Sequence, residues 1–218
     1  ATVEQMRERF VDPGVDFANG PLWVWNDLLT DEQIRSTLQD LAAQGVLQAF
    51  VHPRPGLATP YLSEDWFHLW EVALDEAKKL GMKIWIYDEN SYPSGFAGGF
   101  VPDAMPESRG SGINIEFFDS LTDGAGKWRA GDSILSIYEE LKDGTAVDRT
   151  EEILAARKAE ETIPAKSENG VRWVVSRVQY AGASQWFGGK TYVNLLKPGV
   201  LDAFIGFTHE NYRKHFES

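Results

Sequence analysis

The sequence predicts an α/β fold, and the first hundred residues carry that prediction. They contain three short apolar stretches that each run into polar residues, which is typical of buried strands that end at a loop. Stretches with helical spacing of apolar residues separate them, and each of these ends at a glycine, Gly45 or Gly81. Strands that alternate with helices in this way pair in parallel. The predicted strands are residues 22–25, 46–51 and 82–87.

The helices of this region have recognisable beginnings. Thr2 is expected to cap a short helix that runs to Phe10. Thr30 with Gln33 has the spacing of a capping box, and the helix that follows is expected to stop at Gly45. Ser63 is expected to cap a third helix that ends at Leu80.

The pattern changes after residue 100. Three further strands are expected at residues 113–118, 133–138 and 171–180, with glycine turns at 124–126 and 142–145 between them. Residues 150–161 are charged and fit either a helix or a mobile excursion. We interpret residues 101–186 as an antiparallel β module inserted after the third strand. A buried strand at 192–196 and a helix at 200–216 then complete the chain.

Composition limits the classes of partner. The net charge of -12 argues against nucleic acid and anionic membranes, and no apolar run approaches the ~20 residues of a membrane span. The absence of cysteine excludes disulfides and thiolate nucleophiles. The eight tryptophans suit a ligand with apolar ring faces and hydroxyl edges, such as a sugar, although most are expected in the core. The first residues lack a signal-peptide pattern, so cytoplasm and secretion both stay open.

Polar side chains follow each of the first three predicted strands: Asn26, His52 with Arg54, and Asp88 with Glu89. The carboxyl ends of parallel strands share one edge of a sheet, so we expect these groups to form one site. Asp88 and Glu89 also fit a solvated acidic turn, and the strand alone does not decide between the two interpretations.

Several stretches resemble the α-L-rhamnosidase-type glycoside hydrolases of bacteria and their relatives. In order they read PLWVWND, HPRPGLATPYLSEDWF, AKKLGMKIWIYDENSYPSGFAGG and TYVNLLKPGVLDAFIGFTHENY. The resemblance covers residues 20–100 and 186–216. It implies a partial TIM-type (β/α) barrel: residues 1–100 hold the first three βα units, 101–186 the inserted module, and 187–218 the fourth unit. It also implies a carbohydrate substrate, with the missing half of the barrel or a second copy as partner.

Glycoside hydrolysis commonly needs two carboxyl groups. We expect Glu89 to be one of them, because Trp85 and Tyr87 beside it would raise its pKa toward that of a general acid. Asp88 either contacts substrate or accepts N–H groups of the following loop. The second carboxyl is expected beyond residue 218. We expect no cofactor, with calcium suggested only by the resemblance, because no ligand set for it is evident.

The remaining predictions concern substrate binding. Arg54 either binds hydroxyl groups or pairs with Asp88 or Glu89. His209 and Glu210 are expected to be structural. The alternative function is a non-catalytic carbohydrate-binding or interaction domain. A sugar isomerase or an amidohydrolase is disfavoured, because this sequence lacks the histidine ligands that those enzymes need. The predicted substrate-binding residues are Trp25, Asn26, His52, Arg54, Tyr92 and Asn194.

Overall fold

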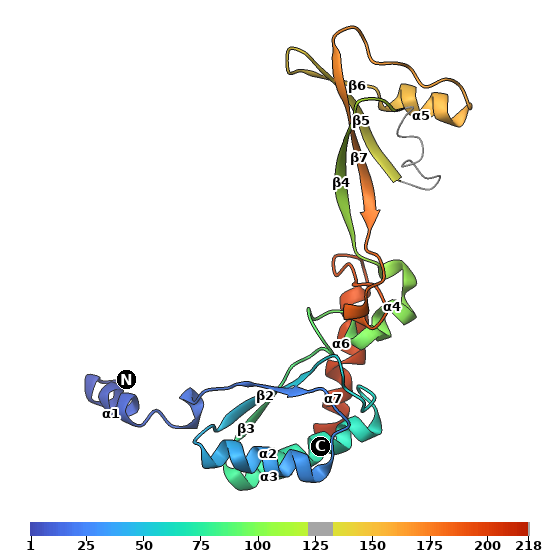
Figure 1. The fold of residues 1–218 in the computed structure, drawn as a ribbon. Coiled ribbons are helices and arrows are strands. Elements are labelled where there is room, and N and C mark those ends of the chain that lie inside the picture. The colour runs from blue at the N-terminus through green and yellow to red at the C-terminus, as the bar shows by residue number, and fades with distance from the viewer. Residues whose placement is uncertain (122–132, 218) are drawn as a thin grey trace. The chain divides into compact units, whose positions relative to one another are not determined.

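The computed structural model describes residues 1–121 and 133–217, and the chain forms two compact units (Figure 1). Unit 1 joins residues 1–108 to residues 183–218, and unit 2 comprises residues 109–182. Each unit has its own sheet. No helix in the described residues is long and apolar enough to cross a bilayer.

Unit 1 contains an open parallel sheet of three strands in the order β1-β2-β3. The register sets Trp23 opposite Val51 and Val51 opposite Ile86, so these side chains share one face. Figure 1 shows α2 and α3 on the same side of this sheet. The strands are β1 (Leu22–Trp25), β2 (Gln48–Pro53) and β3 (Lys83–Ile86), and the helices before and between them are α1 (Val3–Val11), α2 (Asp31–Ala43) and α3 (Glu64–Leu80).

Local signals placed these helices correctly. The Thr30 side chain accepts the Gln33 N–H while the Gln33 side chain accepts the Thr30 N–H, so the predicted capping box is confirmed. Ser63 caps α3, which ends at Leu80 as expected. Apolar residues of α2 and α3 close over the sheet, where Trp25 lies fully buried against the rings of Trp66 and Trp70. This aromatic core fixes one face of the sheet.

The prediction of a partial TIM-type barrel, with its first four βα units, is wrong. The parallel sheet has three strands, and residues 192–196 do not extend it: they form an irregular segment and a turn. The Asn194 Oδ1 accepts the Leu196 N–H at 3.0 Å. Such a local bond offers the backbone an alternative to a strand ladder, and Pro198 soon after has no N–H to give.

The predicted C-terminal helix is divided. α6 (Val200–Phe207) and α7 (His209–Phe216) meet at Thr208, which belongs to neither helix and has φ −95° and ψ −74°. A second core in unit 1 packs α6 and Val193 against the segment after β3, through Phe96, Ala97 and Val101. This segment contains α4 (Phe100–Ala104) and the short 3-10 helices Ala97–Gly99 and Pro106–Ser108; the other 3-10 helices are Val15–Phe17 and Gln185–Phe187.

Unit 2 is a four-stranded antiparallel sheet in the order β4-β7-β5-β6, with a helix against one face. Residues 150–161 were expected to be either a helix or a mobile excursion, and they are mostly helical. Ile153 of this helix packs on Ile137, Trp173 and Val175. The predicted turn at 124–126 lies outside the described residues. The elements are β4 (Ser111–Phe118), β5 (Ser133–Leu141), β6 (Ala146–Asp148), α5 (Thr150–Lys158) and β7 (Gly170–Tyr180).

Candidate functional site

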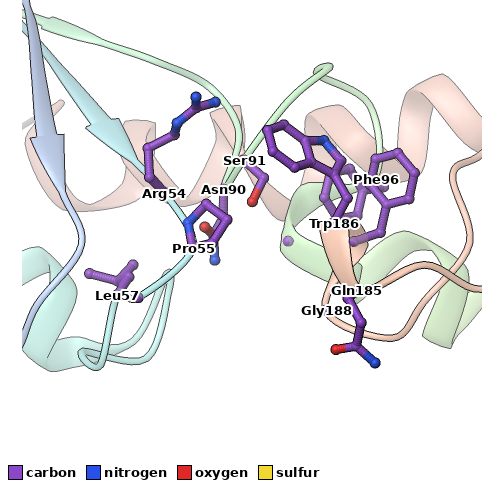
Figure 2. Close-up of a pocket in the computed structure, with 12 residues that line it drawn as sticks. Arg54, Pro55, Leu57, Asn90, Ser91, Phe96, Gln185, Trp186 and Gly188 are labelled. Atoms are coloured by element: carbon purple, nitrogen blue, oxygen red, sulfur yellow. The ribbon is translucent and has the colours of Figure 1, made fainter.

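A cavity of about 260 Å³ lies beyond the carboxyl ends of β2 and β3. We call it the Arg54–Trp186 pocket. Its walls come from the loop after β2, the loop after β3 and the 3-10 turn around Trp186 (Figure 2). Its lining comprises Arg54, Pro55, Gly56, Leu57, Asn90, Ser91, Phe96, Gly98, Gln185, Trp186, Phe187 and Gly188.

Backbone bonds between neighbouring strand ends hold the first two walls. The Arg54 N–H donates to the Trp25 carbonyl at 3.0 Å, which fixes the start of the loop after β2 against β1. The Ser91 N–H donates to the Pro53 carbonyl at 3.1 Å, which fixes the loop after β3 against β2. The parallel register of the sheet therefore sets the positions of both walls.

Arg54 and Trp186 form the most distinctive contact of the pocket. The Arg54 guanidinium carbon lies 5.4 Å from the centre of the Trp186 ring, within the range of a cation–π interaction. The Trp186 Nε1 donates to the Tyr92 carbonyl at 2.5 Å, which orients the ring. Figure 2 shows Asn90 and Ser91 between the two side chains. The pocket thus combines an aromatic face with several hydrogen-bonding groups.

Glu89 lies behind this wall and is fully buried. Its carboxylate accepts five backbone N–H groups, three at Oε2 and two at Oε1. The Ala97 bond measures 2.7 Å, and the Asn90 bond 2.8 Å. The side chain therefore organises the loop after β3. The donors are the N–H groups of Asn90, Gly95, Phe96, Ala97 and Gly98.

Burial raises the pKa of the Glu89 carboxyl to about 7, while the N–H groups of Gly98, Asn90, Ala97 and Gly95 act to lower it. A pKa near neutrality suits a general acid. However, a catalytic acid must contact its substrate, and none of the Glu89 side chain is exposed. The geometry indicates that Glu89 holds the loop after β3 by accepting its N–H groups, a role that the sequence analysis considered for Asp88.

Asp88 is the more accessible of the two carboxylates, with one third of its side chain exposed. Its Oδ1 accepts the Ser94 hydroxyl at 2.5 Å, and its Oδ2 lies 3.4 Å from the His209 Nε2. It also borders a second cavity of about 520 Å³, together with His209, Glu210, Tyr212 and Phe216. Asp88 thus braces the loop and still faces solvent.

The other predicted site residues do not gather in the pocket. Trp25 is fully buried in the aromatic core, where no ligand reaches it. Asn26 is exposed but lies outside the pocket lining, and Asn194 bonds within its own turn. Tyr92 is 58% exposed and contributes its carbonyl to Trp186.

His52 is buried behind the strand ends, and its ring packs on the Tyr87 ring at 4.0 Å. Neither ring nitrogen has a hydrogen-bond partner within the described part of the chain. Burial, reinforced by the charge of Arg54, lowers the pKa of the His52 imidazole. The side chain is therefore held as the neutral imidazole near neutral pH.

Sequence reasoning missed Trp186, Asn90 and Ser91 as lining residues. Trp186 follows Ser184, whose hydroxyl accepts its N–H at 3.2 Å, and precedes Gly188 and Gly189. An aromatic residue between a capping serine and two glycines marks an exposed turn, and that signal was available. His209 and Glu210 also border a cavity, because the helix restarts at His209.

No group of three or more His, Cys, Asp or Glu side chains that would hold a metal ion occurs in residues 1–121 and 133–217. Comparison with protein-family models, with curated proteins and with solved structures finds no match to this chain.

Proposed function

We propose that this chain binds a glycoside in the Arg54–Trp186 pocket, as part of a glycoside hydrolase that acts on α-L-rhamnosides or related glycosides. The observation that carries the proposal is the Arg54 guanidinium beside the Trp186 ring, with Asn90 and Ser91 next to them. An indole ring matches the apolar face of a sugar. Guanidinium, amide and hydroxyl groups match its hydroxyl edge.

The motif resemblance supports the choice of reaction and of sugar. The volume of about 260 Å³ is slightly below that of drug-sized ligand sites, which start at roughly 300 Å³, and suits a single sugar ring. For proton transfer we assign Asp88, because its carboxylate reaches solvent while that of Glu89 does not. Asp88 borders the second cavity and not the Arg54–Trp186 pocket, so it would act on the part of a glycoside that extends beyond the pocket. The Asp88 Oδ2 also lies 3.4 Å from the His209 Nε2, which makes an ion pair with it when the imidazole is protonated.

A second candidate is a non-catalytic carbohydrate-binding domain. The buried Glu89 carboxylate favours it, because five N–H groups occupy both of its oxygens. Most glycoside hydrolases use two carboxyl groups, and with Glu89 buried only Asp88 of this pair is accessible. Binding through Arg54 and Trp186 needs no such pair.

Two measurements on the same preparation separate the candidates. Calorimetric titration with methyl α-L-rhamnoside measures binding, and release of nitrophenol from an aryl α-L-rhamnoside measures hydrolysis. Turnover that Asp88→Asn abolishes supports the hydrolase, and Asn keeps an acceptor for the Ser94 hydroxyl. Saturable binding without turnover supports the second candidate. The absence of both, across a set of monosaccharide glycosides, would overturn each proposal.

A further inference from the structure

Unit 2 exposes an open sheet edge. β4 is the terminal strand in the order β4-β7-β5-β6, and it pairs with β7 over Ser111–Phe118 without a register shift. Its other side meets no strand in the described part of the chain. Exposed edges are normally protected by proline, lysine or a bulge. β4, with the sequence SGINIEFF, has none of these.

The direction of the free backbone groups follows from the ladder. The Ala181 N–H donates to the Gly110 carbonyl at 2.7 Å, so these residues form a hydrogen-bonded pair next to Ser111 and Tyr180. Hydrogen-bonded and non-hydrogen-bonded pairs alternate along an antiparallel ladder. The odd-numbered residues of β4 therefore occupy the non-hydrogen-bonded pairs of the β4–β7 ladder. Their N–H and C=O groups point out to the open edge; these residues include Ile113, Ile115 and Phe117.

The same odd-numbered residues carry exposed apolar side chains. Ile113 is 70% exposed, Ile115 55% and Phe117 56%. They lie on the sheet face opposite α5, because Phe118, of the other parity, packs against the core that α5 covers. The charged residue of β4, Glu116, is on the α5 side, where its Oε2 lies 3.0 Å from the Arg177 Nε. The edge thus offers uncharged side chains and unpaired backbone groups together.

We propose that β4 pairs antiparallel with β4 of a second copy of this chain, around a two-fold axis at Ile115. In this register Ile115 faces its own copy, Ile113 faces Phe117, and Asn114 faces Glu116. Each outward pair exchanges two N–H···O bonds and adds an apolar cross-strand contact. A two-fold axis at Glu116 would instead set two carboxylates opposite each other. The strand complements itself, so a second copy needs no other component.

This inference concerns unit 2 and does not depend on the glycoside-binding proposal. Cross-linking tests the register directly, because the chain contains no cysteine. Facing residues of a hydrogen-bonded pair lie about 5.5 Å apart at Cα, within disulfide range. Mild oxidation of Ile115→Cys should give a covalent dimer. Ile113→Cys should not, since its own copy lies about 14 Å away in this register, four residues along the strand. Equal cross-linking of both variants would overturn the register.

Analytical ultracentrifugation tests the dimer itself. The unchanged chain should sediment as a dimer, and Ile115→Lys or Ile115→Glu alone should be monomeric, because each places like charges opposite each other. A mixture of the two variants should restore the dimer. Val147→Lys, on the other edge strand β6, is the matched control and should leave the dimer intact. A monomeric unchanged chain, or a dimer that survives Ile115→Lys, would overturn the proposal.

Discussion

The backbone N–H of Ala97 donates to the Glu89 Oε2 at 2.7 Å, and this bond ties the end of β3 to the loop that lines the Arg54–Trp186 pocket. Four other backbone N–H groups of the same loop reach the same carboxylate. Glu89 therefore shapes the pocket through Asn90, Phe96 and Gly98, which line it, and not through contact with a ligand.

Replacement of Glu89 by Gln should destabilise the protein by about 2–4 kcal/mol, because the amide NH₂ would face backbone donors that then lose their acceptor. Urea denaturation measures this loss. Glu71→Gln is the control: Glu71 is exposed on α3, and its substitution should change stability by no more than about 0.5 kcal/mol. A stable Glu89→Gln protein would show that the N–H cradle contributes little.

Gly98 should tolerate no side chain. Its φ is +61°, its N–H donates to Glu89, and an added Cβ would lie 2.8 Å from the Cδ1 of the buried Tyr61 ring. Gly45 has a similar φ of +78° but open space around it. Gly45→Ala should therefore cost only the backbone strain, about 1–2 kcal/mol.

Gly98→Ala carries the same strain and the steric overlap in addition, which adds about 1–3 kcal/mol. The difference between the two variants, measured by thermal or urea denaturation, isolates the contact with Tyr61. Equal losses in both variants would mean that the ring moves aside at no cost.

Local signals allowed much of unit 1 to be predicted from the sequence. Caps at Thr30 and Ser63 depend on residues within one helical turn, so a single stretch contains all the information. The three parallel strands were identifiable from their apolar character, although β2 lies two residues further along than expected. Arg54 follows the end of β2 and lines the pocket, while its role in substrate binding stays a prediction.

Features that depend on distant contacts were not predictable in this way. The mostly apolar residues at 192–196 suggested a buried strand, yet the Asn194 side chain and Pro198 favour a turn there. The burial of Glu89 requires the loop to fold back over it, which no local pattern reveals. Trp186 reaches the pocket from a segment that lies far from Arg54 along the chain.

The pH dependence of stability should reveal the buried His52. Its pKa is lowered from 6.5 in the folded protein, chiefly by burial. As the pH falls below about 6.5, the unfolded chain takes up a proton at this residue before the folded protein does. The contribution of His52 to stability is therefore complete above that pH and is lost on acidification, by at most about 1.4 kcal/mol per pH unit for one proton.

His52→Phe keeps a ring against Tyr87 and removes this titration. The free energy of unfolding of both proteins, measured by urea denaturation at several pH values, should differ by an amount that changes below about pH 6.5 and is constant above it. Because all other groups titrate alike in both proteins, they cancel in the difference. Two parallel curves would show that His52 gains its proton equally in the folded and unfolded states.

Trp186 should contribute directly to sugar affinity. Trp186 is 43% exposed, and its ring is held by the bond from its Nε1 to the Tyr92 carbonyl. Trp186→Ala removes the aromatic face and the partner of the Arg54 guanidinium, and it should weaken binding of methyl α-L-rhamnoside by about 1 kcal/mol, or roughly fivefold in Kd. Titration calorimetry measures the change.

Trp85→Ala is the matched control, because Trp85 is 45% exposed and lies outside the pocket lining. Trp85 also packs on the Phe50 ring, so its loss should lower stability and leave Kd unchanged. Equal weakening by both variants would assign the effect to unit 1 as a whole and remove Trp186 from the binding site.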